Sequence, residues 1–448
     1  MKTAVDATAL GRELYDRVRA LYPICRSITG SGVRETLARL AGEIDIRCSD
    51  IPSGTRVFDW TIPNEWNIRD AYVKNSRGER VIDFRQSNLH VMSYSVPVHA
   101  RMSLDELRPY LFSIPEQPDA IPYKTSYYSP RWGFCLSDRL LQSLPDAEYE
   151  VRIDSSLEPG HLTYGECVLP GREAAEVLIS THICHPSLCN DNLSGISVAV
   201  SLAKLLGRMS HRFTYRFLFV PGTIGAIAWL ACNEARAHTI AHGLVLAGVG
   251  DRGSINYKRS RQGRAEIDRA VAHVFAHAGQ QSGIEDFSPA GYDERQYCSP
   301  GFNMPVGVLS RTPWGRYPEY HTSADNLDFV CPAALADSLA TCLDVIEVLE
   351  DNTTLISQNQ KCEPQLGARG LYASLGGHRR GGQATDAALL WVLNLSDGMH
   401  SLLEIAERSG LAFTVIHRAA ATLIDAGLLL DVNAVPQPAR WRRTGTTI

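Results

Sequence analysis

A repeated order of strand, loop and helix in the second half of the chain constrains its fold more than any other feature. Short apolar runs that are typical of buried strands occur at residues 177–180, 215–220, 244–248 and 306–309. Apolar residues at helical spacing occur at residues 193–208, 224–235, 264–280 and 332–350. Strands that alternate with helices form an α/β fold in which helices cover both faces of a sheet. We therefore expect an α/β domain with an at least partly parallel sheet.

The first 150 residues have a different texture. Residues 8–43 carry apolar positions at helical spacing on either side of the turn-rich segment 27–32, which predicts two helices joined by a loop. Beyond them lie short β-type runs broken by Pro and Gly, at residues 56–62, 80–84 and 89–94. We expect residues 51–150 to form a mostly β domain, inserted between parts 1–50 and 151–370 of the α/β domain.

The C-terminal tail has its own pattern. The Gly-rich segment 375–382 predicts a linker. Periodicity then predicts three helices and a short strand, at residues 385–394, 401–408, 412–426 and 428–430. This order is typical of a winged helix-turn-helix, which we place at residues 383–448. Residues 375–448 hold seven Arg and no Lys against six acidic residues, too little positive charge for duplex binding, so packing or dimerisation is the expected role.

Composition excludes several classes of partner. The chain has 448 residues with 44 Lys and Arg against 49 Asp and Glu, and a net charge of −5 argues against a polyanion-binding protein. No stretch approaches the roughly 20 apolar residues of a membrane helix, and the first residues lack the apolar core of a secretory signal. The 11 Cys form no C-x-x-C motif, as is typical of reduced thiols. We expect a cytoplasmic protein without a membrane or nucleic-acid partner.

The densest chemical signal is the segment 180–195, Ser-Thr-His-Ile-Cys-His-Pro-Ser-Leu-Cys-Asn-Asp-Asn-Leu-Ser-Gly, between a predicted strand and a predicted helix. Open α/β sheets bind their ligands at this edge. His182 and His185 offer imidazoles and Asp191 offers a carboxylate, a combination that suits zinc. The alternative is that one His is structural and that Asp191 only caps the helix.

Two further candidates follow other strands. Asp251 comes after the third predicted strand and His321 after the fourth, so both can converge on the sheet edge that carries His182. Cys184 and Cys189 are weaker candidates for metal ligands, because buried free cysteine is common.

Four motifs resemble a known family. They are His182-Ile-Cys-His-Pro, Asn190-Asp-Asn-Leu-Ser-Gly195, Gly291-Tyr-Asp-Glu-Arg-Gln296 and Glu319-Tyr-His-Thr-Ser-Ala-Asp-Asn326. They resemble the co-catalytic zinc aminopeptidases of the bacterial leucyl aminopeptidase type, and more closely a bacterial aminopeptidase-like branch with a β insertion and a C-terminal winged helix. The resemblance covers nearly the whole chain. It implies a mixed, mostly parallel sheet flanked by helices.

The resemblance also implies a site for one or two divalent ions, with zinc as the expected metal. The first ion would be bound by His182, Asp191 and Asp251. Asp191 would bridge to a second ion, which His321 also binds. A shared carboxylate suits two cations that activate water and hold the carbonyl oxygen as it becomes an oxyanion.

The chain departs from this family after the second predicted strand. Family enzymes carry two adjacent Glu there, a general base and a ligand of the second metal, whereas this chain has Gly222 and Thr223. Three explanations are open: one zinc with a base recruited elsewhere, two metals with His185 filling the gap, or an inactive site. Glu294 and Glu319 are the candidate bases, with an ion pair or a plain surface carboxylate as the alternative role.

Candidate substrate-binding residues are basic or aromatic and lie near these motifs. They are Tyr257, Lys258, Arg261, Arg295 and Tyr320. Such groups bind a carboxylate or polarise a carbonyl, although a solvated surface is the alternative. The aromatic segment 121–134 is suited to a pocket wall, a subunit contact or a small core.

The first hypothesis for function is therefore a zinc-dependent, aminopeptidase-like hydrolase of a small peptide-like or amide-containing metabolite, acting in general turnover or in a biosynthetic pathway. The alternative is a degenerate aminopeptidase fold that binds a ligand without turning it over, which Gly222 favours. A transcriptional regulator is a third hypothesis, and the charge of the tail argues against it. Assembly into a homo-oligomer would use the insertion or the winged helix.

Overall fold

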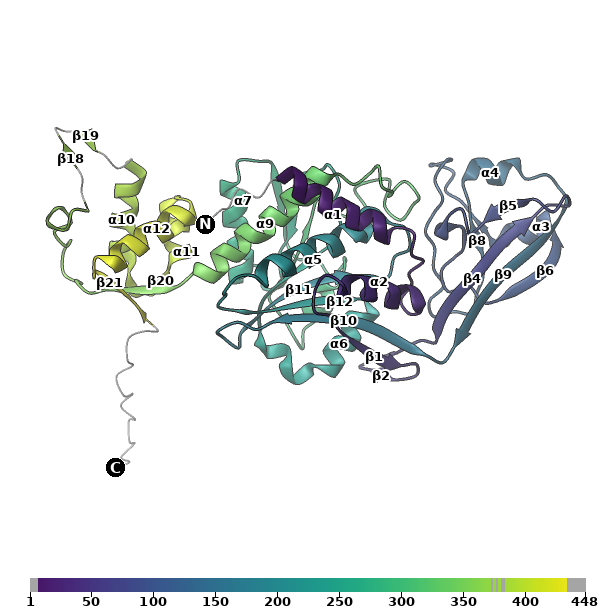
Figure 1. Cartoon of the computed structure of the whole chain (residues 1–448), viewed down its shortest axis with the longest axis horizontal. Helices are drawn as coiled ribbons and strands as arrows, with labels where there is room; N and C mark the ends of the chain where they lie inside the picture. Colours follow the sequence, from purple (N-terminus) through teal and green to yellow (C-terminus); the bar gives the residue numbers. More distant parts are fainter. Residues whose placement is uncertain (1–6, 372–373, 376–377, 380–382, 433–448) are drawn as a thin grey trace, which may run out of the picture. The chain divides into compact units, whose positions relative to one another are not determined.

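The protein is described by a computed structural model that covers residues 7–371, 374–375, 378–379 and 383–432. The chain forms two compact units (Figure 1). The main unit holds the described residues up to Arg269 together with Gln280–Leu343. The C-terminal unit holds Ala270–Gly279 and the described residues from Asp344 onward.

An eight-stranded mixed sheet runs through the main unit in the order β1-β10-β12-β11-β13-β16-β14-β15. Its strands are β1 (Arg47–Pro52), β10 (His161–Leu169), β11 (Glu176–His182), β12 (Thr214–Val220), β13 (Ile240–Leu246), β14 (Ile255–Lys258), β15 (Ser282–Glu285) and β16 (Val306–Ser310). The four central strands, β12, β11, β13 and β16, are parallel. Antiparallel neighbours, β10 and β14, flank them on either side. The predicted α/β fold with a mixed, mostly parallel sheet is confirmed.

Helices cover both faces of this sheet. Those that lie wholly in the main unit are α1 (Ala7–Leu21), α2 (Ser31–Ala41), α5 (Gly195–Leu206), α6 (Ile224–Cys232) and α8 (Glu294–Tyr297). Two others, α7 (Glu266–His277) and α9 (Pro332–Asp351), begin in the main unit and continue into the C-terminal unit. In Figure 1, α1 and α5 lie on one face and α6 lies on the other. Every residue of β11 is buried, as expected for a central strand that is covered on both sides.

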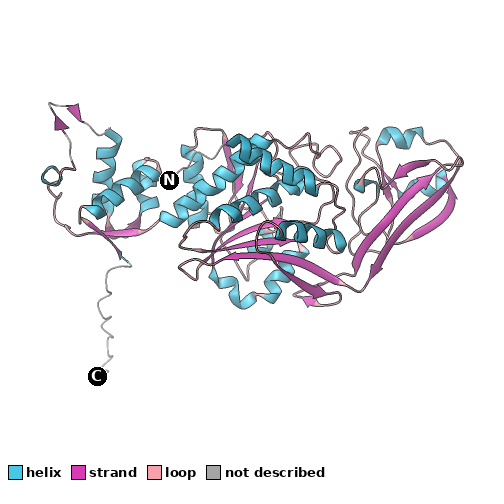
Figure 2. Cartoon of the chain, viewed as in Figure 1, coloured by secondary structure: helices cyan, strands magenta, loops and turns pink. Residues whose placement is uncertain are grey.

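The insertion between β1 and β10 consists mainly of strands (Figure 2). Its elements are β2 (Arg56–Val57), β3 (Trp60–Thr61), β4 (Glu65–Lys74), β5 (Arg80–Asp83), β6 (Val98–Ser103), α3 (Leu104–Leu107), β7 (Leu111–Phe112), β8 (Phe134–Cys135), α4 (Asp138–Ser143) and β9 (Glu148–Glu158). A four-stranded sheet, β5-β4-β9-β6, covers a separate core that includes Leu107, Phe134 and Val151.

The strand predicted at residues 89–94 is wrong. Residues Asn88–His90 form a single 3₁₀ turn, and the residues after it make only isolated bridges, Val91 to Phe134 and Ser93 to Thr125. The hydroxyl of Ser87 accepts a hydrogen bond from the Leu89 amide, so a side chain satisfies a donor that a strand would pair with its neighbour.

The C-terminal unit contains a winged helix. Its elements are β17 (Thr354–Ser357), β18 (Ser374–Leu375), β19 (His378–Arg379), α10 (Gln383–Leu395), β20 (Asp397–Ser401), α11 (Leu402–Ser409), α12 (Phe413–Asp425) and β21 (Leu429–Asp431). The three predicted helices are present, and β20-β17-β21 form the accompanying sheet. Residues 376–377 and 380–382 of the predicted linker, and residues 433–448 of the tail, lie outside the described residues. No helix in the described part of the chain has the length and apolar character to cross a membrane.

Candidate metal centre

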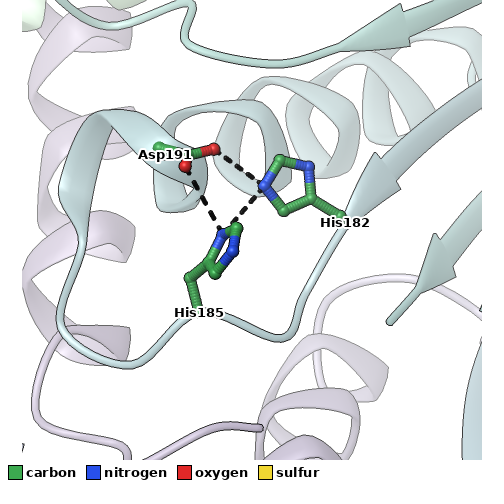
Figure 3. A group of neighbouring side chains, drawn as sticks. All are labelled: His182, His185 and Asp191. Atoms are coloured by element: carbon green, nitrogen blue, oxygen red, sulfur yellow. Dashed lines mark hydrogen bonds and ion pairs between the residues drawn. The ribbon is translucent and has the colours of Figure 1, made fainter. Parts of the chain in front are cut away.

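Two histidines and an aspartate meet where β11 ends. His182 is the last residue of β11, and the chain after it turns back so that His185 and Asp191 face it (Figure 3). Nε2 of His182 lies 2.8 Å from Oδ1 of Asp191 and 3.1 Å from Nδ1 of His185. Nδ1 of His185 lies 3.6 Å from Oδ2 of Asp191. These atoms form a compact set of possible metal ligands.

His321 brings a third imidazole to the same carboxylate. Its Nε2 lies 3.0 Å from Oδ2 of Asp191. In a tetrahedral zinc site with bonds of about 2.0–2.1 Å, ligand atoms lie about 3.3 Å from one another. The separations among His182, His185 and Asp191 are 2.8, 3.1 and 3.6 Å, close to this spacing, and His321 meets the same carboxylate at 3.0 Å.

Buried polar contacts hold the loop that carries these side chains. The carboxylate of Asp325 accepts hydrogen bonds from the backbone N–H of Asn190 at 2.6 Å and of Asp191 at 2.9 Å. Nε of Arg26 donates to the carbonyl oxygen of His185 at 2.9 Å. Burial raises the pKa of Asp325 to about 8, although the two backbone N–H groups act in the opposite direction. These contacts fix the ligand positions from distant parts of the chain, as outer contacts do in metal sites.

The charges in the cluster suit metal binding. Burial lowers the pKa of His185 to about 3, so its imidazole is neutral and keeps a lone pair at neutral pH. Burial by itself raises the pKa of Asp191, but the imidazoles of His185 and His182 outweigh it and hold that pKa well below its usual range. An ionised carboxylate beside a neutral imidazole is the protonation state that a zinc site requires.

Several polar atoms of the cluster have no hydrogen-bond partner although they are buried. Two of them, Oδ2 of Asp191 and Nε2 of His321, face each other at 3.0 Å, whereas Nδ1 of His182 is on the side of its ring away from Asp191. Burial of such atoms without partners costs free energy, which a bound cation offsets. Imidazole nitrogens with a carboxylate are a donor set that zinc prefers, so these residues fit a divalent ion of that type.

Asp251 does not join the cluster, contrary to the expectation. Its Oδ2 accepts hydrogen bonds from Nδ2 of Asn190 at 3.0 Å and from the N–H of Thr312 at 3.1 Å. Its Oδ1 accepts from Oγ1 of Thr312 at 2.7 Å and from the N–H of Gly253 at 2.6 Å. Four donors occupy the carboxylate, so Asp251 joins the loop after β13 to its neighbours instead of offering a free oxygen to a metal.

The two carboxylates expected to act as a base have other surroundings. Glu294 is fully buried, forms an ion pair with Lys258 and accepts the N–H of Tyr292 at 3.0 Å, which gives it a structural role. Glu319 is partly exposed, and its carbonyl oxygen accepts the N–H of Thr322 at 3.0 Å. Within the part of the chain that the structure describes, neither carboxylate forms a hydrogen bond or an ion pair with the cluster.

The basic and phenolic candidates after Asp251 are also structural. The Tyr257 hydroxyl is buried and donates to Oδ1 of Asp268 at 2.8 Å. Besides its ion pair, Lys258 donates to the carbonyl oxygen of Ala290 at 2.6 Å. Arg261 is exposed and donates to Oδ1 of Asn303 at 2.8 Å. None of these three faces the cluster, because partners within the fold already take their polar groups.

Aromatic rings frame the cluster. Tyr320 stacks on His321 with a centroid separation of 3.9 Å, so this expected residue does lie at the site. Tyr123 packs edge-on against His185 and His321, at 5.1 and 5.2 Å. Tyr123 belongs to the aromatic segment of the insertion, which therefore supplies part of the wall. Arg295 is exposed on α8 and, among the described residues, forms no hydrogen bond or ion pair with the cluster.

Two neighbouring residues at the site, Tyr292 and Asp293, were missed from the sequence. The ring of Tyr292 stacks on His182 with centroids 5.4 Å apart. Asp293 is fully buried, and neither of its oxygens has a hydrogen-bond partner. Burial raises the pKa of Asp293 to about 7, with His182 acting in the opposite direction. The sequence signal for both residues is the motif at residues 291–296, which also contains Glu294.

Gly222 and Cys184 lie beside these residues. A Cβ placed on Gly222 would lie 3.1 Å from Cβ of His182 and 3.5 Å from Oδ1 of Asp293. Sγ of Cys184 contacts the Gly222 carbonyl oxygen at 3.7 Å and is not part of the ligand cluster. Position 222 therefore borders the site without contributing a side chain to it.

A cleft of about 200 Å³ opens beside Tyr292. Its lining includes Lys258, Tyr292, Trp314 and Arg316. Trp314 is 45% exposed, and its ring lies 6.4 Å from that of Tyr320, which stacks on His321. Tyr292 therefore contacts both the cleft and His182, and Tyr320 lies between Trp314 and His321.

Comparison with known proteins places this site in a family. Residues 15–352 match the family described as "Domain of unknown function (DUF4910)", and residues 354–431 match a winged helix-turn-helix family. A protein of Clostridium acetobutylicum named "Putative polysaccharide biosynthesis protein with aminopeptidase-like domain" is 51% identical over 424 residues, which cover 95% of this chain and 97% of that protein.

Solved structures agree with the fold. A crystal structure described as a putative peptidase from Clostridium acetobutylicum has a TM-score of 0.91 at 50% identity and covers 95% of this chain and 98% of its own. A zinc aminopeptidase from Bacillus subtilis has a TM-score of 0.56 at 9% identity, with 76% of this chain and 94% of that chain covered. A peptidase M28 precursor from Shewanella amazonensis has a TM-score of 0.53 at 14% identity, with 80% and 97% covered.

The last two likenesses show the fold alone. The match over residues 15–352 shows that the chain belongs to the DUF4910 family, and its main unit has the fold of the zinc aminopeptidases and is followed by a winged helix.

Proposed function

We propose that the protein is a metal-dependent hydrolase that cleaves an amide bond in a small peptide-like or amide-containing metabolite. The observation that carries this proposal is the convergence of His182, His185 and His321 on the buried carboxylate of Asp191. The cluster stands at the carboxyl end of a central parallel strand, where α/β sheets bind their ligands. The aminopeptidase fold of the solved neighbours supports the same class of reaction.

The residues of the chain define what each part of the site does. A divalent cation held there would supply Lewis-acid activation of water and of the substrate carbonyl. His185, kept neutral by burial, presents a lone pair at neutral pH, and Asp191 offers both oxygens. The rings of Tyr123 and Tyr292 pack against the imidazoles and limit the access of water.

The cleft beside the cluster is the proposed place for the rest of the substrate. Its exposed Trp314 and the ring of Tyr292 offer flat apolar surfaces, and Arg316 lines it in an ion pair with Glu285 at 2.6 Å. The relative from Clostridium acetobutylicum is named for polysaccharide biosynthesis, which supports a dedicated biosynthetic substrate over general peptide turnover. We propose zinc as the metal.

A second candidate function is a binding protein that keeps the fold without turnover. Gly222 favours it, because this position borders the cluster and offers no side chain for proton transfer. Loss of a general base costs roughly 10²-fold to 10⁴-fold in rate. The two candidates differ in one measurable property, which is multiple turnover.

The test is hydrolysis of a panel of simple aminoacyl anilides, short peptides and N-acylated amino sugars by the zinc-loaded protein. We expect multiple turnover of at least one amide outside the aminoacyl anilides, and loss of this turnover and of bound zinc in Asp191→Ala. Cys184→Ser is the matched control, because Cys184 lies beside the cluster without joining it and should leave both unchanged. Equal turnover in Asp191→Ala and the wild type would contradict the proposal.

A further inference from the structure

A second cavity in the main unit shares no lining residue with the cleft beside Tyr292. Its volume is about 370 Å³, within the range of roughly 300–1,000 Å³ that small-molecule sites occupy. Part of its wall is the hairpin of β2 and β3, at the start of the insertion, and the rest comes from α6 and the segment around α8. In Figure 1, β2 lies beside α6. We call this cavity the hairpin pocket.

Exposed aromatic rings gather at the hairpin pocket. Five large aromatic side chains are exposed among the described residues of the main unit, and three of them, Phe58, Trp60 and Tyr128, lie here. Phe58 meets Phe302 edge-on with centroids 5.8 Å apart, and Trp60 lies 5.5 Å from Tyr128. Contiguous apolar surface of this kind costs free energy in water and marks a binding site.

The backbone at Phe58 shows that this ring is held against the preference of the chain. Val57 pairs with Trp60, so Phe58 and Asp59 alone form the turn between β2 and β3. Phe58 has φ 53°, in the left-handed region where Gly and Asn are favoured and a bulky residue is rare. Folding alone does not explain an exposed ring at this position, whereas strain of this type is common at ligand-binding sites.

Polar side chains without partners lie beside the rings. Asp59, Glu234 and Ser299 line the hairpin pocket, and within the described structure their side chains form no hydrogen bond or ion pair. Gln296 also lines it and has one long contact, with Oγ1 of Thr223 at 3.5 Å. The described lining contains no basic side chain, so its two carboxylates repel a phosphate or a carboxylate ligand.

We propose that the hairpin pocket binds a saccharide that carries no negative charge. A pyranose ring packs its C–H face against aromatic rings, which Phe58 and Trp60 supply. Its hydroxyls donate to carboxylates and exchange hydrogen bonds with an amide or another hydroxyl, the groups of Gln296 and Ser299. These two neutral side chains favour a polyol over a simple organic cation, for which rings and carboxylates suffice.

The hairpin pocket adjoins the metal centre. Gln296 contacts Thr223, whose neighbour Gly222 borders His182. A run of contacting side chains also leads from the pocket to the cluster: Trp60, Tyr128, Tyr127, Tyr123 and His185. The inference goes beyond the proposed function, because saccharide binding requires neither the metal nor turnover.

The experiment measures saccharide binding to the full-length protein in the presence of a chelator. Saturation-transfer-difference NMR is recorded with glucose, galactose, glucosamine and N-acetylglucosamine, and with glucuronic and galacturonic acid as anionic counterparts. We expect signals from at least one uncharged or amino sugar and none from the two uronic acids. Titration with the sugar that binds then gives its dissociation constant.

Variants assign the binding to the hairpin pocket. Trp60→Ala and Phe58→Gly should each raise the dissociation constant roughly 10-fold, because each removes a stacking surface. Phe58→Gly should not lower the unfolding midpoint, since glycine is favoured at φ 53°. Tyr110→Ala is the matched control, because it removes an exposed ring of the insertion that does not line the pocket, and it should leave the dissociation constant unchanged.

Each contrary outcome overturns the proposal in a different way. Equal affinity in the wild type, Trp60→Ala and Phe58→Gly would place any saccharide site elsewhere. Binding of no sugar in the panel, or of the uronic acids alone, would exclude the proposed ligand class. Binding of tetramethylammonium chloride without any sugar would make the pocket a cation site. A smaller assembly of Trp60→Ala in sedimentation, again without sugar binding, would assign the rings to a contact between copies. All of these results would leave the proposed function intact.

Discussion

Replacing Glu294 by Gln tests whether the structure has assigned neighbouring carboxylates correctly. Glu294 is buried, its Oε1 forms an ion pair with Lys258, and its Oε2 accepts the N–H of Tyr292. Breaking a buried ion pair costs about 3–5 kcal/mol when a charge is left without compensation. Lys258 keeps the carbonyl oxygens of Ala290 and Ser288 as partners, and Gln keeps one acceptor oxygen. We therefore expect a loss of about 2–3 kcal/mol.

The assay is calorimetric unfolding with a parallel zinc measurement. A loss of this size lowers the midpoint of the main unit by about 4 °C, since large units shift less per kcal/mol than small ones. Zinc content should stay at the wild-type value, and Glu319→Gln should change neither quantity. An unchanged midpoint combined with loss of zinc or of turnover would refute the structural role of Glu294 and restore it as a functional residue.

Three further changes have distinct expected results. Asp251→Asn should keep full zinc content but lower the free energy of unfolding by about 2 kcal/mol in thermal unfolding. The reason is that the amide NH₂ would face the donors of Thr312. Loss of zinc from this variant would return Asp251 to the ligand set. Burial lowers the pKa of His273 to about 4, and its Nε2 accepts the N–H of Phe413. As the pH falls, the unfolded chain therefore takes up a proton at this residue before the folded chain does. The stability of the C-terminal unit should fall as the pH decreases from about 6.5 to 4. Hydrogen exchange of the Phe413 amide measures this loss of stability. An unchanged protection factor at pH 4.5 would contradict the role of His273. Trp314→Ala should raise KM about 3-fold to 10-fold with kcat unchanged, and an unaffected KM would remove the cleft from substrate binding.

Local sequence pattern was a good guide to the elements. The runs at 177–180, 215–220 and 306–309 became β11, β12 and β16, because apolar strands of this length can be buried only inside the sheet. The ends were less certain: the helix predicted at 224–235 stops at Cys232, and the strand predicted at 244–248 ends at Leu246.

The side chains of the site were harder to predict than its location. His182, His185 and Asp191 lie within ten residues, so one loop brings them together and the sequence could indicate the cluster. Asp251 also follows a strand, yet Thr312, far along the chain, decides that its carboxylate turns away. Sequence position cannot show which distant donors a side chain meets.

The same limit explains the missed carboxylate. Asp293 and Glu294 are neighbours at the start of α8, and their chemistry is nearly the same. Lys258 pairs with Glu294 and leaves Asp293 without a partner, which only the packing of β14 against this segment reveals. Tyr123 likewise reaches the site through the folding of the insertion, whose aromatic content alone gave several possible roles.

The most direct test of the metal centre is a crystal of the protein soaked in zinc chloride, with anomalous diffraction recorded on both sides of the zinc absorption edge. The account predicts anomalous density within bonding distance of Asp191 and of the imidazoles of His182, His185 and His321. Absence of such density in a fully soaked crystal, or density only at other surface residues, would contradict the central claim.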